Sequence, residues 1–204
     1  MTSKKQVVIG LLGTTLDNRT GPDRWTRWRP TVCLAQQPDF LMDRLELLVQ
    51  DSREALGSLI AADVQQASPE TRVQLHEIAF PDPWDFESVY AALYDFARRY
   101  PFDTEHEEYF VHITTGSHVM QICLFLLAES RIIPAKLLQS GVKSWRDPAG
   151  FVTVIDLDLS RYDKIARRFE EKHAEGLHFL KSGIETKNAA FNRLISDIAR
   201  VCEA

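Results

Sequence analysis

Apolar runs and amphipathic segments alternate along most of this chain. A short run rich in β-branched residues predicts a buried strand, whereas apolar side chains three or four positions apart predict a helix. Strands are expected at 6–12, 44–50, 71–79, 108–113, 135–139 and 151–157, and helices at 31–37, 52–67, 86–100 and 119–130. Segment 44–50 also fits a helix, but its Leu-Leu-Val run just before a helical segment favours a strand.

The order of these elements indicates the fold class. Strands that alternate with helices form parallel pairs, because each parallel neighbour requires a crossover connection. We therefore predict an α/β, Rossmann-like domain over residues 1–160, with a mostly parallel six-stranded sheet and helices on both faces. Beyond residue 160, apolar positions recur at spacings of three, four and seven, which predicts a helical linker over 161–204.

Charge and composition narrow the classes of function. The net charge of −5 argues against a surface that coats nucleic acid, since such binding needs many Lys and Arg contacts to phosphates. Any phosphate site must therefore be local. The longest apolar stretch, 119–128, is too short to span a bilayer, and the start of the chain lacks a signal peptide, so we expect a cytoplasmic protein without membrane contact.

Motifs for metals and cofactors are missing from the sequence. Cys33, Cys123 and Cys202 lie far apart without CxxC spacing, which predicts reduced thiols, and no HExxH motif or His/Cys cluster indicates a metal. There is no P-loop, and Gly10 and Gly13 are too weak a match to a dinucleotide fingerprint. We expect neither a metal nor another cofactor, and no catalytic residue is assigned.

Two loops that follow predicted strands carry small, hydroxyl-bearing residues. Ligands of open α/β sheets bind at the carboxyl ends of strands, and such loops hold phosphates with N–H and hydroxyl donors. The second loop opens directly onto a helix, whose amino end favours an anion. The candidate ligand-binding residues are Gly13, Thr14, Thr15, Asp17, Thr114, Thr115, Gly116, Ser117, His118 and Gln121. Taken alone, the second loop fits a simple strand-to-helix turn capped by Ser117, but two matched loops favour binding.

Segment 19–30 reads RTGPDRWTRWRP and offers a third source of ligand contacts. Arginine forks suit phosphates and indole faces suit bases, so a nucleotide ligand fits this composition. Its candidate residues are Arg24, Trp25, Arg27, Trp28 and Arg29. The alternative, weighted equally, is that Asp17 and Asp23 pair with the arginines while the tryptophans anchor the loop.

Three further residues have competing interpretations. Trp84 either closes a pocket or caps a helix, and we favour the capping role; Asp82-Pro83 or Asp85 can also cap the helix at 86–100. His112 lies within a strand and is expected to be a packed core residue. If the pocket were a slow nuclease, His118 would be its acid or base.

Nearly the whole chain resembles one family of regulators. The resemblance rests on GLLGTTLD (10–17), RWTRWRPTVCLAQQ (24–37), DRLELL (43–48), PWDFESVYAALYDFAR (83–98), HITTGSHVMQICLFLLAESR (112–131) and IDLDLSRYDKIARRF (155–169). These runs are similar to the N-terminal CARF regulatory domain of the RtcR family, the sigma-54-dependent activators of RNA-repair operons that encode an RNA ligase and an RNA cyclase. Residues 180–201 resemble the lead-in to the AAA+ ATPase module that follows in that family and is absent here.

The resemblance implies a sensor. RNA with a 2′,3′-cyclic phosphate end, or a related oligonucleotide such as cyclic oligoadenylate, is expected to bind and relieve autoinhibition of the ATPase. CARF sites form across homodimers, so the two loops should face a two-fold axis. In the full-length protein the other implied partners are the AAA+ domain, sigma-54 RNA polymerase and DNA.

One position departs from the family pattern, and two other functions stay open. Many CARF domains carry Lys or Arg where this chain has His118, which leaves the phosphate charge to backbone N–H groups or to the arginines of 19–29. The alternatives to a sensor are a ring nuclease or RNase acting on cyclic oligoadenylate at the same pocket, and a dimerisation module with a vestigial pocket.

Overall fold

The computed structural model describes residues 4–144 and 147–155 of the 204-residue chain. The chain divides after residue 157 into two units, and every described residue belongs to the first. The predicted linker at 161–204 and the last two residues of the predicted strand 151–157 lie outside the described residues. In the described part, no helix is both long and apolar enough to cross a membrane.

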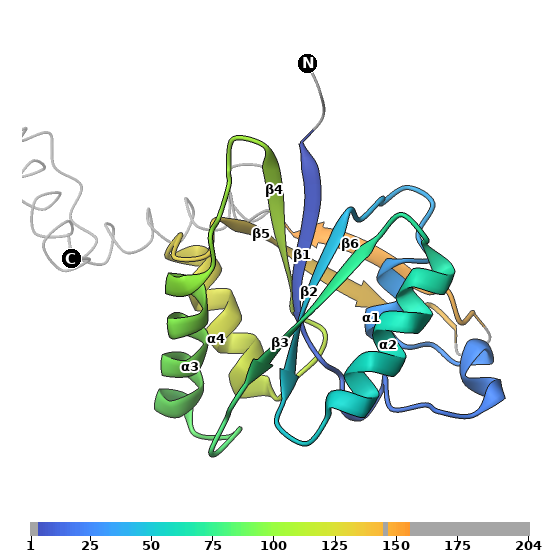
Figure 1. The fold of residues 1–204 in the computed structure, drawn as a ribbon, viewed down its shortest axis with the longest axis horizontal. Coiled ribbons are helices and arrows are strands. Elements are labelled where there is room, and N and C mark those ends of the chain that lie inside the picture. Colours follow the sequence, from blue (N-terminus) through green and yellow to red (C-terminus); the bar gives the residue numbers. More distant parts are fainter. Residues whose placement is uncertain (1–3, 145–146, 156–204) are drawn as a thin grey trace, which may run out of the picture. The chain divides into compact units, whose positions relative to one another are not determined.

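Six strands form one sheet (Figure 1). They are β1 Lys5–Leu11, β2 Arg44–Gln50, β3 Arg72–Ile78, β4 Glu107–His112, β5 Ala135–Gly141 and β6 Phe151–Ile155. Their order across the sheet is β3-β2-β1-β4-β5-β6, and all neighbours from β3 to β5 are parallel. Strand β6 pairs antiparallel with β5, because the connection at 142–150 is too short for a crossover.

Helices cover both faces of this sheet, and each face has its own core. The helices are α1 Pro30–Leu34, α2 Glu54–Ala67, α3 Phe86–Arg99 and α4 His118–Glu129, with a 3₁₀ helix η1 at Pro22–Thr26. Side chains of α3 and α4 pack on one face, and those of α1 and α2 pack on the other (Figure 1). Burial of apolar side chains in these two layers provides the main stabilisation of the domain.

The predicted Rossmann-like architecture is confirmed. Every predicted strand and helix within the described residues is present, with bounds shifted by no more than three residues. Segment 44–50 is a strand, as the pattern favoured. The 3₁₀ helix η1 was not predicted, because a single turn with Pro22 at its start leaves no helical periodicity in the sequence.

The strand order creates a topological switch point between β1 and β4. From β1 the chain builds the sheet outwards through β2 and β3, whereas β4, on the other side of β1, leads outwards to β5. The connections that follow β1 and β4 therefore run to opposite faces and leave a crevice between their carboxyl ends. Both loops predicted to bind the ligand begin at this crevice.

The opposite, amino-terminal end of the sheet carries a polar network that the sequence did not indicate. The Arg44 guanidinium on β2 binds both carboxylate oxygens of Glu107 on β4, at 2.6 and 2.7 Å, and reaches Glu46 at 2.6 Å. The Tyr100 hydroxyl donates to Glu46, whose other oxygen pairs with His76 at 2.6 Å. The hydrogen bonds from Arg44 hold the pKa of Glu107 below its usual range.

Removing the central cation of this network should destabilise the fold. In Arg44→Met, the buried Glu46 and the partly buried Glu107 lose their Arg partner, and an unpaired buried charge costs about 3–5 kcal/mol. Urea denaturation measures this loss in the free energy of unfolding. The exposed Arg53, which forms no ion pair among the described residues, provides the control Arg53→Met; equal effects of both changes would show that the network contributes nothing special.

Candidate functional site

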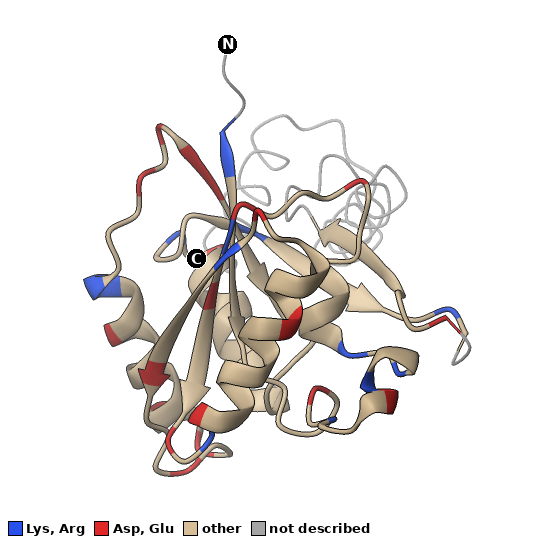
Figure 2. Ribbon diagram, turned by 45° about the vertical axis from the view of Figure 1, so that its right-hand side comes forward, with Lys and Arg blue, Asp and Glu red and all other residues tan. Residues whose placement is uncertain are grey.

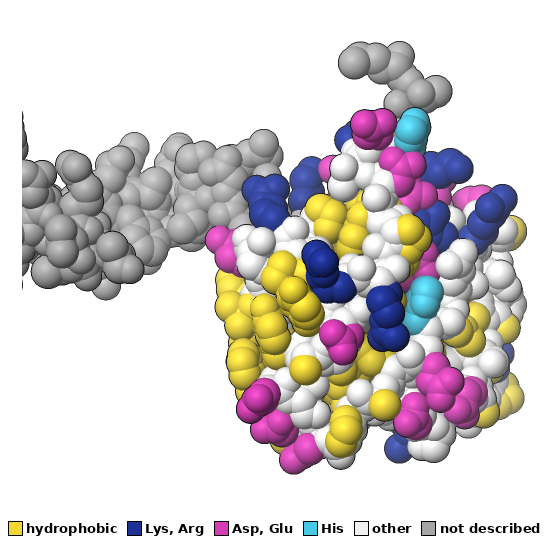
Figure 3. Space-filling model, turned by 60° about the vertical axis from the view of Figure 1, so that its left-hand side comes forward, with side chains coloured by type: hydrophobic (Ala, Val, Ile, Leu, Met, Phe, Trp, Pro, Cys, Tyr) yellow, Lys and Arg dark blue, Asp and Glu magenta, His cyan; other side chains and the backbone are white. Residues whose placement is uncertain are grey.

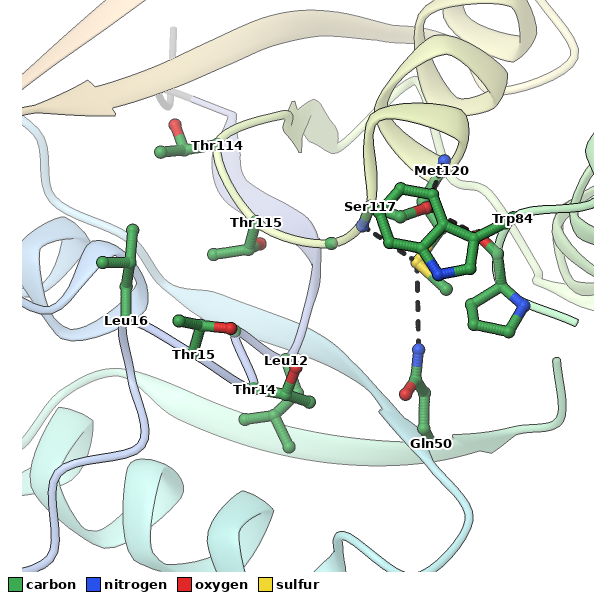
Figure 4. A pocket seen from close by; sticks show the side chains of 13 residues that line it. Leu12, Thr14, Thr15, Leu16, Gln50, Trp84, Thr114, Thr115, Ser117 and Met120 are labelled. Carbon is green, nitrogen blue, oxygen red and sulfur yellow. Dashed lines mark hydrogen bonds between the residues drawn. The ribbon is translucent and has the colours of Figure 1, made fainter.

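A cavity of about 330 Å³ lies at the switch point, between the loops that follow β1 and β4 (Figure 4). It is lined by Leu12, Gly13, Thr14, Thr15, Leu16, Gln50, Pro83, Trp84, Thr114, Thr115, Gly116, Ser117 and Met120. The lining joins the carboxyl ends of β1, β2 and β4 to the amino end of α4 and the segment before α3. Seven of the ten residues predicted from the two loops are therefore brought together here.

The fully buried Asp17 supports the first loop. Its carboxylate accepts the backbone N–H of Thr31 at 3.1 Å and the Thr31 hydroxyl at 2.6 Å, in the first turn of α1. A Cβ at position 13 would collide with this carboxylate, so only glycine lets the loop close over Asp17. Asp17 therefore supports the cavity wall and does not line the cavity.

The second loop is fixed by hydrogen bonds of its own hydroxyl groups. Thr115 donates to the Leu11 carbonyl at 2.6 Å, and Thr114 donates to the Ser140 carbonyl at 3.1 Å. Ser117 accepts the Met120 N–H at 3.2 Å, so it caps α4 as expected, and it donates to the Pro83 carbonyl at 2.8 Å. Gly116 has φ of +90°, a conformation that favours glycine. These hydroxyls hold the loop in shape.

Both loops leave hydrogen-bond donors for a ligand, because the backbone N–H groups of residues 114–116 in the second loop form no hydrogen bond among the described residues. Among the described residues, no hydrogen bond engages the Thr14 and Thr15 hydroxyls or the backbone N–H groups of residues 13–16. Figure 4 shows Thr14 and Thr15 lying across the cavity from Thr115 and Ser117. The amino end of α4 adds its partial positive charge at the opposite wall. This arrangement suits an anion.

The lining carries no ionisable side chain, so the cavity itself is neutral. Figure 2 shows Lys and Arg spread over several elements, with none on α4. In residues 4–144 and 147–155, no group of three or more His, Cys, Asp or Glu could hold a metal ion. An anion bound here would be neutralised by N–H dipoles and hydroxyl groups, unless a cation comes from elsewhere.

The Arg- and Trp-rich segment lies outside the cavity lining. Arg24 and the buried Arg29 both bind Asp63 of α2, at 2.9 and 2.5 Å; burial alone would raise the pKa of Asp63, but these two arginines lower it. The guanidinium of Arg29 also lies 5.2 Å from the Trp25 ring centroid.

The other two members of the segment differ in their surroundings. The indole N–H of Trp28 is buried, and a Cβ at Gly150 would lie 2.7 Å from that nitrogen. Arg27 is exposed. The expected pairing of the arginines with Asp17 and Asp23 was wrong, because Arg24 and Arg29 bind Asp63 instead. Ligand contact by Arg24, Trp25, Arg27, Trp28 and Arg29 stays a prediction.

His118 and Gln121 occupy the first turn of α4, as expected, but neither lines the cavity. His118 is exposed, whereas the Gln121 amide lies 3.4 Å from the Gly116 carbonyl and supports the loop. His112 is a core residue, as expected; it is buried, and its Nε2 lies 2.8 Å from the Ser140 hydroxyl. Burial lowers the pKa of His112 to about 3, so its ring is neutral at physiological pH.

The favoured interpretation of Trp84 was wrong. Asp85, not Trp84, caps α3, because its carboxylate accepts the Ser88 N–H at 2.8 Å, while Trp84 lines the cavity. Gln50 was missed as well. Gln50 is the last residue of β2 and Trp84 follows β3, and the carboxyl ends of these strands share the edge occupied by β1 and β4, which is the signal that could have indicated them.

Comparison with known proteins places the chain among regulators. The family model described as RtcR, Regulator of RNA terminal phosphate cyclase, matches residues 4–183. The transcriptional regulatory protein RtcR of Escherichia coli (strain K12) is 51% identical over 202 residues, which cover 97% of this chain. The match spans only 38% of that relative's length.

One solved structure supports the fold independently of sequence. Enterococcus italicus Csm6 bound to cyclic hexa-2′-fluoro-hexa-dAMP matches with a TM-score of 0.56 at 12% identity, covering 98% of this chain and 56% of that one. At this identity the likeness shows the fold alone. It agrees with the Rossmann-like CARF fold that the sequence resemblance implied.

Asp17 and His112 predict opposite dependences of stability on pH. Burial raises the pKa of Asp17 from 3.8 to about 6, although its hydrogen bonds with Thr31 act to lower it. Protonation of Asp17 therefore stabilises the folded state. This stabilisation is fully present below pH 3.8 and is lost as the pH rises through about 6. The pKa of His112 falls from 6.5 to about 3, so its contribution is present above pH 6.5 and is lost on acidification. Between pH 3.8 and about 6, acidification therefore stabilises the fold through Asp17 and destabilises it through His112.

Asp17→Asn should unmask the histidine effect. As the pH falls from 6 to 3.8, the variant's free energy of unfolding should drop more steeply than that of the wild type, because the stabilising protonation of Asp17 is gone. Urea denaturation across this pH range measures both profiles, with the exposed Asp23→Asn as control. Parallel profiles for Asp17→Asn and wild type would contradict a raised pKa of Asp17 in the folded protein.

Proposed function

The chain belongs to the RtcR family of regulators of RNA terminal phosphate cyclase, and from this membership we propose that it is the ligand-sensing part of a transcriptional activator. Its ligand is RNA with a 2′,3′-cyclic phosphate end or a related oligonucleotide. Ligand binding relieves autoinhibition of an AAA+ ATPase in the full-length protein, which then acts with sigma-54 RNA polymerase on DNA. The observation that carries this proposal is the cavity between the carboxyl ends of β1 and β4.

The cavity chemistry supports a phosphate ligand of low charge. Free N–H groups of residues 13–16, two free hydroxyls and the amino end of α4 provide donors and dipoles but no full positive charge. A cyclic phosphate is a diester with one negative charge, which these groups can neutralise more fully than the two charges of a monoester. The family description names an enzyme of RNA terminal phosphates, so an RNA end matches the regulated chemistry.

The same lining favours a sensor over a nuclease. General acid–base cleavage needs a titratable group within hydrogen-bond reach of the reacting atoms. The thirteen lining residues in the described part of the chain include no Asp, Glu, His, Lys, Cys or Tyr. His118, the candidate acid or base, is exposed beside the cavity and not in it.

An exposed apolar face on α3 and α4 supports the proposed homodimer. Figure 3 shows hydrophobic side chains gathered on this side of the molecule. The exposed members are Phe86, Tyr94, Ile122, Phe125 and Leu126, with Tyr90 stacked between Phe86 and Tyr94. Monomeric proteins rarely expose large contiguous apolar patches. Because α4 also forms the cavity wall, a second copy docked here would bring two cavities close to one two-fold axis.

Binding of an RNA end can be tested through the two free hydroxyls. Thr14→Val/Thr15→Val keeps the side-chain shape but removes both donors, and a hydrogen bond to a charged group contributes about 1.5–3 kcal/mol, or roughly tenfold or more in affinity for each. Isothermal calorimetry with a short RNA ending in 2′,3′-cyclic phosphate should show this loss. The same RNA with a 3′-hydroxyl end and cyclic tetra-adenylate serve as ligand controls.

Thr20→Val is the matched protein control, since Thr20 is exposed near the same loop and does not line the cavity. It should bind as the wild type does. Unchanged affinity of the double variant would show that the Thr14 and Thr15 hydroxyls do not bind the RNA. Tighter binding of cyclic tetra-adenylate than of the RNA would show that the cavity has a different ligand.

If the apolar face of α3 and α4 is the dimer interface, a charged residue placed in it should separate the two protomers. Ile122→Glu or Phe125→Glu should convert a dimer to a monomer, because a carboxylate buried in an apolar interface is strongly unfavourable. Sedimentation velocity measures the mass. Leu41→Glu, at an exposed side chain in the connection between α1 and β2, should leave the dimer intact. A wild-type chain that remains monomeric at high concentration would refute the dimer.

A further inference from the structure

Trp84 is a large aromatic side chain left in solvent at the mouth of the cavity. It is 66% exposed, the highest value among the exposed large hydrophobic side chains of the described residues, yet it lines the cavity together with the loops that follow β1 and β4 (Figure 4). No other aromatic side chain belongs to the described lining. Neither core packing nor helix capping explains it, since Asp85 caps α3.

The indole is presented from a backbone that is fixed on both sides. The backbone N–H of Trp84 donates to the Asp82 carboxylate at 2.8 Å. Pro81 and Pro83 restrict the backbone around that turn. The Pro83 carbonyl accepts the Ser117 hydroxyl at 2.8 Å. Because Ser117 is the cap of α4, the same hydrogen bond ties the Trp84 segment to the second loop of the cavity.

We propose that Trp84 stacks on the base of the nucleotide whose phosphate lies between the two loops. This inference rests on the proposed function and names the ligand more closely, as a single-stranded RNA end. An exposed indole offers a flat face to any base, and stacking of this kind is sequence-tolerant. A base inside a duplex has both faces covered, so only an unpaired terminal nucleotide presents a free face to Trp84.

The cavity has the dimensions that this arrangement requires. At about 330 Å³ it is at the small end of ligand pockets, which range over roughly 300–1,000 Å³, and this volume suits one nucleotide. Hydroxyl and N–H donors of the two loops line one part of the cavity, and the exposed indole lies at its edge. Phosphate and base are thus recognised by different walls, and the remaining RNA extends into solvent.

A double-mutant cycle between protein and RNA tests the stacking directly. The 204-residue chain is titrated into a labelled single-stranded RNA that ends in 2′,3′-cyclic phosphate, and binding is measured by the fluorescence anisotropy of the RNA. The terminal nucleotide of the RNA is either normal or abasic. Trp84→Ala should weaken binding of the normal RNA about 5- to 150-fold, the range that corresponds to one stacked base. It should leave binding of the abasic RNA unchanged, because the base that it contacts is already missing.

Two further variants make the outcomes decisive. Trp84→Phe keeps a smaller ring and should lose less affinity than Trp84→Ala, while Leu41→Ala removes a side chain that is 65% exposed and outside the cavity lining, and should change nothing. Equal loss for normal and abasic RNA, or no loss for either, would overturn the stacking while RNA binding by the wild type still stood. Failure of the wild type to bind either RNA would instead overturn the proposed function and this inference together.

Discussion

The divergence of the chain on either side of β1 and β4 is the constraint on which the site depends. Parallel strands end at one edge of the sheet, and at a switch point the following connections leave for opposite faces. Leu11 ends β1, and its carbonyl accepts the Thr115 hydroxyl from the loop after β4. That hydrogen bond ties the loop after β4 to the end of β1, and burial of Asp17 against Gly13 fixes the loop after β1.

The two Arg-centred ion-pair clusters of the described domain involve no residue of the cavity lining, which is neutral. Arg44 satisfies Glu46 and Glu107 at the amino-terminal end of the sheet, and Asp63 receives the guanidinium groups of Arg24 and Arg29. An ion pair of this kind is already neutralised and has little to offer a ligand. A phosphate at the proposed site would therefore be recognised by dipoles, whose orientation is set by the two loops and by α4.

The sequence predicted the sheet, its helices and seven cavity residues, because strands, helix faces and strand-end loops leave periodic or local signals. It did not predict interactions between residues far apart in the chain. Asp63 as the partner of Arg24, and Ser117 as the anchor of the Trp84 segment, depend on tertiary packing that no local pattern encodes. Trp84 was misassigned for the same reason, since Asp85 beside it satisfied the local capping pattern equally well.

Hydrogen–deuterium exchange with and without RNA ending in 2′,3′-cyclic phosphate examines the site most directly, because the free N–H groups of residues 13–16 are themselves the proposed ligand contacts. Protection on RNA binding should concentrate in peptides that contain residues 13–16 and 114–119, and RNA with a 3′-hydroxyl end should give less. Protection confined to segment 19–29, or absent from both loops while RNA is bound, would contradict a phosphate site at the β1–β4 switch point.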